Sequence, residues 1–223
     1  MNKLYISIFS IFLIFLLIIG SIFLIPINLV VSNLLKNSDL EIQYSYLEGN
    51  IFGGRILDLY YENNHIGDFN YHNEFSLTEM QTKFISIDEK KIEGTVIKKL
   101  SHISDIDTFA IRNFSMSNVI STDFIKYVDV NLDVEEMEII DSQCIKIIGI
   151  LEISSQEIKE ELIGKLACFE SNTISAELFD KKNRELGNIA FTDSQAKVNI
   201  STKTIPDKRV QLLTDYISFT IDF

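Results

Sequence analysis

Hydrophobic residues follow two different patterns along this chain. From Leu4 to Ile25 nearly every residue is apolar and none is charged, whereas from Leu40 onward apolar and polar residues alternate. An apolar run of about 20 residues is long enough to span a ~30 Å hydrocarbon core. Alternation with a period of two is typical of strands with one buried face. The sequence therefore predicts one membrane span followed by a mainly β domain.

We interpret the apolar run as an uncleaved anchor. A cleavable signal peptide has a shorter apolar region, about 7–15 residues, followed by a small-residue cleavage site. Here the run ends at Pro26 without an A-x-A pattern, and an unusually long signal peptide is the alternative. Lys3 precedes the span, and no acidic residue occurs before Asp39. The positive-inside rule then predicts a single-pass inner-membrane protein with a cytoplasmic N-terminus and a periplasmic C-terminal domain.

The predicted organisation is an anchor with a short connector, residues 1–36, and one extracytoplasmic β-domain, residues 37–223. Short segments rich in β-formers, separated by polar turns, are typical of an antiparallel sheet. The segments predicted as strands include "LEIQYSYL", "ILDLYYENN", "IGDFNYHNEF", "IEGTVIKKL", "FAIRNFSMSNV", "VDVNLDV", "CIKIIGILEI", "LIGKLACFE", "TISAELFD", "IAFTD" and "AKVNIST".

Helices are predicted at only two places after the connector. Ser76 and Glu79 have the spacing of a capping box, which favours one short helical turn, and "PDKRVQLLTDYI" begins with Pro206. The chain shows no alternation of strands with helices, which argues against a parallel sheet. The predicted fold is a mainly β one: a transmembrane helix followed by a curved antiparallel β-meander, trough- or sandwich-like, with one or two short helices.

The stretch "LEGNIFGGRI" contains three of the chain's 9 glycines. A phosphate-binding loop requires GxxxxGK[ST] followed by a helix, and here strand-like sequence follows instead. We therefore interpret these glycines as structural. The prediction is a β-turn at Gly49-Asn50, a bulge or close strand crossing at Gly53-Gly54, and Phe52 packed beneath the turn.

The chain's two cysteines, Cys144 and Cys168, lie in two successive predicted strands. A hairpin centred near Gln156 places them opposite each other, together with Ile150 opposite Leu162 and Ile148 opposite Gly164. Opposed residues of an antiparallel pair have Cα atoms about 4.5–5.5 Å apart, which is within disulfide range. A bridge would form in an oxidising compartment, and two buried free thiols are the alternative.

An N-terminal span, a strand and a Gly-x-aliphatic-aromatic-x-Gly hairpin resemble the N protein of bacterial type II secretion systems. A second similarity is a cysteine followed about 25 residues later by "G-x-L-x-C", here Cys144 and Gly164 to Cys168. The aromatic position of the hairpin is Phe52, where the family commonly has Trp. The resemblance implies a non-enzymatic inner-membrane accessory or scaffold subunit of the secretion machinery, with other membrane or periplasmic subunits as partners.

Charge and residue spacing argue against several classes of function. The net charge is −12, with no basic cluster, which argues against nucleic-acid binding. The three histidines, His65, His72 and His102, lack zinc-ligand spacing and are expected to face solvent. The acidic stretch from Asp133 to Asp141 lacks the glycine of an EF-hand loop, and strict alternation predicts a solvated strand edge. No cofactor, metal or catalytic residue is therefore predicted.

A second function remains open on sequence grounds. The chain is also similar in plan to the lipopolysaccharide-export C protein, which implies an envelope lipid or lipopolysaccharide transport bridge with a periplasmic β-trough. Such a trough needs an inward face that stays apolar from strand to strand. The residues that could supply it are Ile147, Leu151, Ile163, Ile174 and Leu178. In either interpretation the lipid bilayer is contacted through the span.

Overall fold

The computed structural model describes residues 26–28, 31–32, 41–61, 64–88, 91–102, 105, 108–120, 127–169, 173–192, 195–205 and 208–222. The predicted span, Leu4–Ile25, lies outside these residues, as does the predicted domain boundary at residue 36. Among the residues described, no helix combines the length and the apolar character needed to cross a bilayer.

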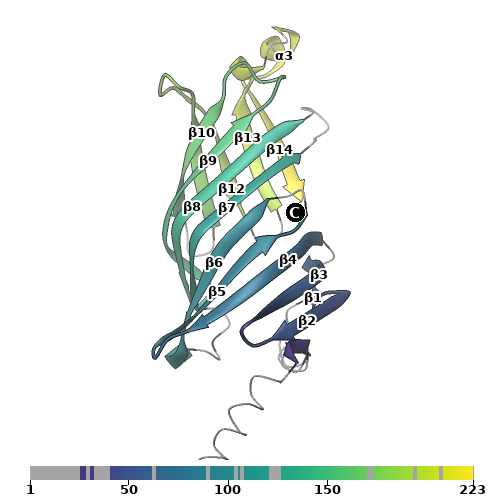
Figure 1. Ribbon diagram of the computed structural model, residues 1–223. Helices are drawn as coiled ribbons and strands as arrows, with labels where there is room; N and C mark the ends of the chain where they lie inside the picture. Colours follow the sequence, from purple (N-terminus) through teal and green to yellow (C-terminus); the bar gives the residue numbers. More distant parts are fainter. Residues whose placement is uncertain are drawn as a thin grey trace, which may run out of the picture. The chain divides into compact units, whose positions relative to one another are not determined.

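The described chain is mainly β, and its 14 strands belong to one antiparallel sheet (Figure 1). The strands are β1 Ile42–Gln43, β2 Tyr46–Asn50, β3 Gly53–Tyr61, β4 Asn64–Phe75, β5 Glu79–Ser86, β6 Ile92–Lys99, β7 Phe109–Ile120, β8 Val128–Ile140, β9 Gln143–Ser154, β10 Leu162–Phe169, β11 Thr173–Phe179, β12 Glu185–Phe191, β13 Gln195–Ser201 and β14 Tyr216–Asp222. The prediction of a mainly β antiparallel fold with few helices is confirmed.

The helical segments described are short. Residues 27–28 and 31–32 are helical, and the other helical segments are the 3-10 helices η1 Leu100–His102 and η2 Thr202–Thr204 and the α-helix α3 Lys208–Leu213. The predicted helix after Pro206 is confirmed by α3. The helical turn predicted at Ser76 is wrong: the Ser76 hydroxyl accepts a hydrogen bond from the Glu79 backbone N–H, but Glu79 already begins β5. Ser76 stabilises a turn instead of a helix, because the residues after it lack the apolar spacing of a helix.

Close contacts divide the chain into two compact units, Met1–Asn73 and Glu74–Phe223. In the first unit, β3 pairs with β2 along its beginning and with β1 along its end. The β2–β3 turn is formed by Ile51 and Phe52, between the paired residues Asn50 and Gly53. The turn predicted at Gly49-Asn50 is therefore two residues too early.

The glycines of this hairpin occupy crowded positions. Gly49 has a φ of +111°, and a Cβ atom on it would lie 2.3 Å from the Gly53 carbonyl oxygen. A Cβ atom on Gly54 would lie 2.0 Å from the Glu48 carbonyl oxygen and 2.6 Å from the Tyr71 hydroxyl. The backbones of β2 and β3, together with the Tyr71 side chain of β4, therefore leave no room here for any side chain larger than hydrogen.

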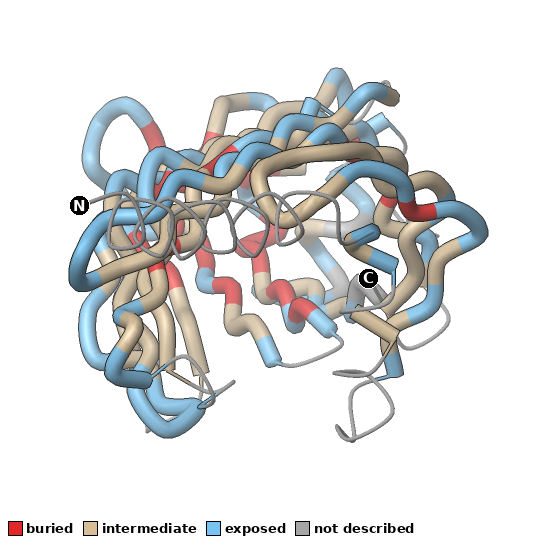
Figure 2. Tube along the Cα trace, turned by 60° about the horizontal axis from the view of Figure 1, so that its bottom comes forward, coloured by how far each residue is buried: buried red, intermediate tan, exposed pale blue. Residues whose placement is uncertain are grey.

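In the second unit, each strand from β5 to β14 follows its sequence neighbour in the sheet. Its core is a single cluster of buried apolar residues from β8 to β13, which includes Ile158 in the β9–β10 connection. Leu151, Leu162 and Leu178 are completely buried, and Val198 is 1 % exposed. Figure 2 shows such buried positions recurring along the strands, between intermediate and exposed ones. The sheet of this unit is thus packed on one face and solvated on the other.

The alternation predicted for Asp133–Asp141 is wrong. The β8–β9 register shifts between Val134 and Glu136, so Glu135 is an extra residue in β8. Val134 is buried, and Met137, three residues later, also packs against the core. A β-bulge moves the following side chains to the other face, and period-two reasoning cannot anticipate it.

Candidate interaction surface: the apolar face and free edge of the β5–β14 sheet

One row of paired residues crosses nine strands of the second unit, and every member is apolar or glycine. From β6 to β14 the row is Ile92, Met116, Leu132, Leu151, Gly164, Leu178, Gly187, Ile200 and Ile217. The adjacent row, one residue along, is polar except for one position: Glu93, Ser115, Asp133, Ile150, Lys165, Glu177, Asn188, Asn199 and Ser218. We call these faces the inner face and the outer face.

Large and small residues alternate where the inner face is most tightly packed. Leu178 is completely buried and is paired with Gly164 on one side and Gly187 on the other. A Cβ atom on Gly164 would lie 3.0 Å from Leu178 Cδ2, and one on Gly187 would lie 2.1 Å from the Asn199 carbonyl oxygen. The glycines therefore make room for the leucine and for the neighbouring backbone, and the core here is filled.

Four of the five positions that sequence analysis offered for a trough lie on the inner face. Leu151 and Leu178 are completely buried, and Ile147 and Ile174 pack against the core. The prediction for Ile163 is wrong, because Leu162 and Gly164 on either side of it are buried. Ile163 therefore lies on the outer face.

The inner face is less covered on the first strands of this unit. Phe84 of β5 and Phe114 of β7 are half-buried, and their rings lie 6.4 Å apart with Gly94 between them. Met116 and Ile92 are also half-buried. The apolar rows thus continue beyond the filled part of the core onto strands that are only partly enclosed.

The last strand, β14, has a regular pairing edge. Its seven residues pair with seven consecutive residues of β13, from Ser201–Tyr216 to Gln195–Asp222, without a register shift. Among the strands that the structure describes, β13 is its only partner. Tyr216, Ser218 and Thr220 are exposed, while Ile217 and Phe219 are half-buried. The opposite side of β14 therefore presents backbone groups that no described strand satisfies.

The disulfide predicted between Cys144 and Cys168 is present, but the register predicted for the hairpin is wrong. Leu162 lies opposite Ile153 instead of Ile150, and Gly164 lies opposite Leu151 instead of Ile148. The register is therefore shifted by three residues, and the centre of the hairpin lies between Glu157 and Ile158 instead of near Gln156. The cysteines are nevertheless bonded to each other, beyond the last paired residues of the hairpin, Lys165 and Ile150.

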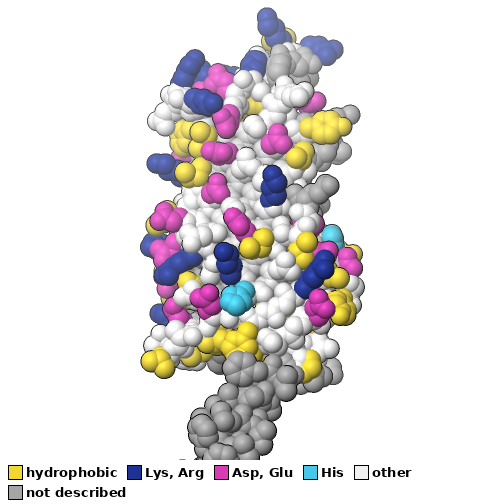
Figure 3. Space-filling view, in the orientation of Figure 1, with side chains coloured by type: hydrophobic (Ala, Val, Ile, Leu, Met, Phe, Trp, Pro, Cys, Tyr) yellow, Lys and Arg dark blue, Asp and Glu magenta, His cyan; other side chains and the backbone are white. Residues whose placement is uncertain are grey.

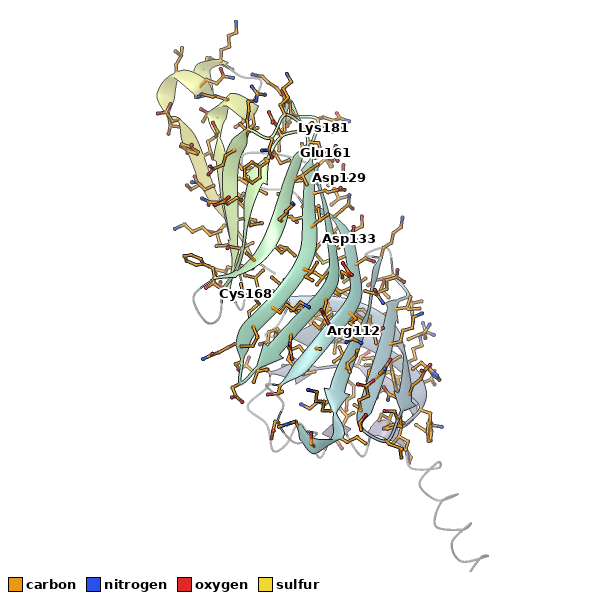
Figure 4. All side chains as sticks on the ribbon, turned by 90° about the vertical axis from the view of Figure 1, so that its left-hand side faces the viewer. Arg112, Asp129, Asp133, Glu161, Cys168 and Lys181 are labelled. Atoms are coloured by element: carbon orange, nitrogen blue, oxygen red, sulfur yellow. A yellow bond between two sulfur atoms is a disulfide. The ribbon has the colours of Figure 1, made fainter. Side chains whose placement is uncertain are left out.

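Charged side chains of the outer face form local pairs. Glu136 accepts a hydrogen bond from Lys146 and lies 3.6 Å from Arg112, and these two cations hold the pKa of Glu136 below its ordinary value. Lys181 lies 2.9 Å from Glu161, and Figure 4 shows the two at the same end of the unit. On the face shown in Figure 3, acidic and basic side chains are interspersed. No single-sign surface for a polyanion appears among the described residues in that view.

Asp180 is the one buried carboxylate in the described chain, and Arg184 satisfies it. Arg184 donates to Asp180 from its backbone N–H at 2.9 Å and from Nε at 2.6 Å, and the Lys182 backbone donates at 2.8 Å. Burial alone would raise the pKa of Asp180, but the donors prevail and lower it to about 2. Arg184 also pairs with Glu160 at 3.2 Å, which ties the β11–β12 turn to the β9–β10 connection.

In the first unit, Asp58, His65 and Asp68 place one potential metal-ligand atom each within 4.8 Å of one another. Asp58 has a φ of +49°, and its backbone N–H donates to Asp68 at 2.8 Å. The ligand atoms of a tetrahedral zinc site lie about 3.3 Å apart, given bonds near 2.0 Å, so these groups would have to close in to hold an ion. The sequence search missed the cluster because a bulge in β3 creates it.

These residues do not form a nucleophilic triad. The Ser45 hydroxyl donates to Asp58 at 2.6 Å, and His65 Nε2 lies 3.8 Å from the other Asp58 oxygen. In a triad the histidine lies between the nucleophile and the carboxylate, whereas here the carboxylate lies between the other two. His102, in the second unit, contacts Asp105 at 2.9 Å. All three histidines are exposed.

A pocket of about 570 Å³ opens on the second unit near the β5–β6 connection. Its polar lining comes mainly from outer-face residues, among them Glu93, Ser115, Asp133 and Glu152, with Lys91 at its margin. Ser115 donates to Glu93 at 3.5 Å. Four outer-face groups of this kind are typical of a solvated strand surface.

Comparisons with protein-family models, with curated proteins and with solved structures find no match for this chain.

Proposed function

We propose that the chain is a non-enzymatic, inner-membrane-anchored accessory or scaffold subunit of a bacterial type II protein secretion system. The observation that carries the proposal is the combination of a filled core with a regular free edge. Leu151, Leu162 and Leu178 leave no room for a ligand among them, while β14 keeps one side available. Sheet edges bind extended segments of partner proteins through backbone hydrogen bonds.

The resemblance of the Gly49–Gly54 hairpin and of the Cys144/Cys168 strands to the secretion N protein supports the choice of machinery. The disulfide supports an oxidising compartment, because such bridges form in the periplasm and are rare in the cytosol. The proposed location is therefore the inner membrane, with the β-domain in the periplasm and the predicted span Leu4–Ile25 as the anchor. The partners are other membrane or periplasmic subunits of the machinery.

A specific observation favours a second candidate, an envelope lipid-transport bridge. The apolar rows continue onto β5, β6 and β7, where Phe84, Phe114 and Met116 are only half-buried. A half-open apolar face of this kind suits an acyl chain. The filled β9–β13 region makes this the second choice, because a continuous trough would need the same openness along the whole unit.

Purification of the tagged full-length chain from membranes, followed by mass spectrometry of both proteins and lipids, tests the proposal. The expected result is co-purification of secretion-system subunits in amounts comparable to the chain itself. A matched control is a tagged chain with the same residues 1–36 fused to an unrelated periplasmic domain. Recovery of about one lipid per chain without secretion subunits would overturn the proposal and favour the lipid bridge.

A further inference from the structure

We propose that the free edge of β14 pairs with β14 of a second copy of this chain. The two strands run antiparallel about a two-fold axis at Phe219. This inference rests on the proposed function, since it names one occupant for the edge that a scaffold subunit offers.

The first argument is that β14 is unprotected as a strand edge. Protein edges are normally shortened, bulged, or guarded by lysine or proline. The segment Tyr216–Asp222, "YISFTID", contains no lysine, arginine, proline or glycine, and it pairs with β13 without a bulge. By contrast, β1 has two residues, and β2 has five residues with Gly49 at positive φ. β14 is therefore the strand best suited to accept another strand.

The second argument is that the order of residues in β14 is self-complementary. On either side of Phe219, Ser218 corresponds to Thr220 and Ile217 to Ile221, and only the end residues, Tyr216 and Asp222, differ in type. Two copies paired about Phe219 therefore place hydroxyl residues opposite hydroxyl residues and isoleucine opposite isoleucine. Cross-strand pairs of like apolar or hydroxyl residues stabilise antiparallel sheets. A shift of the register by one residue would instead oppose inner-face and outer-face positions.

The third argument is continuity of the inner face. Ile217 is paired with Ile200, and Phe219 with Val198, so the apolar rows of the core reach β14. Phe219 is half-buried at the end of its row and packs against the core cluster. A second β14 strand at this edge would continue both rows into the inner face of the other copy and cover the exposed side of Phe219.

Charge also favours this edge as the contact. The chain carries a net charge of −12, so two copies repel each other over most of their surface. From Tyr216 to Ile221 there is no charged residue. A contact centred on Phe219 therefore brings together the segments where repulsion is weakest.

The test uses disulfide cross-linking of the full-length chain in detergent micelles. The native cysteines are bonded to each other, so an introduced cysteine is the only free thiol. In the proposed register Ser218 faces Thr220 of the other copy, with Cα atoms about 4.5–5.5 Å apart. Two Ser218 residues lie on the diagonal, about 7–8 Å apart, beyond disulfide reach. A mixture of differently tagged Ser218→Cys and Thr220→Cys chains should form cross-tag dimers several-fold more efficiently than either variant alone.

Asn188→Cys is the matched control, because Asn188 is an exposed outer-face residue of an interior strand. It should give no cross-linked dimer.

A second pair of variants tests the same contact by charge repulsion and attraction. Ser218→Lys/Thr220→Lys and Ser218→Glu/Thr220→Glu should each be monomeric in light scattering, and their mixture should dimerise. If the two charged variants were simply misfolded, mixing them would not restore the dimer.

Monomers at every concentration, or equal cross-linking of Ser218→Cys with itself, would overturn the inference. These experiments can refute the β14 dimer and the proposed function independently of each other. Co-purified secretion subunits with no self-pairing would refute only the β14 dimer. A β14 dimer that co-purifies with lipid and no subunits would refute the proposed function and leave the dimer standing.

Discussion

Cys144 of β9 and Cys168 of β10 are bonded to each other, with Cα atoms 5.5 Å apart. The direct pairing of β9 with β10 extends from Leu162–Ile153 to Lys165–Ile150 and ends before the cysteines. The bridge thus joins the two strands beyond the last residue pair of their hairpin. The bridge stabilises the hairpin by closing the loop between the two strands at the end opposite the turn.

Replacing both cysteines, Cys144→Ser/Cys168→Ser, should lower the free energy of unfolding by about 3–4 kcal/mol. The chain-entropy model gives this figure for a closed loop whose ends are 24 residues apart. Because the chain has no Trp, urea unfolding is best followed by the β-sheet circular dichroism signal. Reductant should lower the urea midpoint of the wild type and leave that of the variant unchanged. Equal midpoints for the two proteins without reductant would contradict the prediction.

The sequence predicted the antiparallel β class, most strand positions, helix α3 and the cysteine pair, because each depends on local period or on pairing within one hairpin. It failed where one extra residue changes the register. Glu135 forms a bulge that puts both Val134 and Met137 on the inner face. The register of the β9–β10 hairpin is shifted by three residues, and Ile158 in the connection is buried. Such shifts are decided by packing across strands.

Gly187→Ala should destabilise the second unit strongly, by about 3 kcal/mol or more. A Cβ atom there would lie 2.1 Å from the Asn199 carbonyl oxygen, and backbone cannot move aside without disrupting the β12–β13 pairing. Gly94→Ala is the matched comparison, since the nearest atom to its Cβ is the tip of the Phe84 ring at 2.9 Å. Gly94→Ala should lower the free energy of unfolding by less than Gly187→Ala does. Urea midpoints in the reverse order would contradict the filled core described here.

Asp180 should make stability depend on pH in the acid range. Its pKa in the folded chain is about 2, below the ordinary value of 3.8. The folded state therefore binds the proton less readily than the unfolded state, and the stabilisation is fully present above pH ~4 and lost as pH falls toward ~2. Asp180→Asn should be less stable than the wild type at pH 7 and should lose less stability on acidification.

The control for this experiment is Asp133→Asn, which changes an exposed outer-face carboxylate of β8. Thermal unfolding of the three proteins between pH 2 and pH 7 provides the comparison. Asp133→Asn should follow the wild type. If the Asp180→Asn curve ran parallel to that of the wild type over the whole range, the Arg184–Asp180 pairing would not be the source of the pH dependence.

The candidate surface was less predictable than the fold. No local pattern marks β14 as the free edge, because whether a strand has a second partner depends on the order of all the other strands. The Asp58, His65 and Asp68 cluster depends on a bulge in β3 and was equally hidden. The continuous inner-face row was foreseen in part: Leu151 and Leu178 were correct, and Ile163 was placed on the wrong face for lack of the correct register.

The proposed function requires that this chain bind protein through β14 and not carry lipid along its inner face. Site-specific photo-crosslinking in living cells tests it most directly, with the photoreactive residue at Ser218 or at Met116 and with Asn188 as the control. The account predicts protein adducts from Ser218, either a second copy or an envelope subunit, and none from Asn188. Lipid adducts from Met116 together with no protein adduct from Ser218 would contradict it.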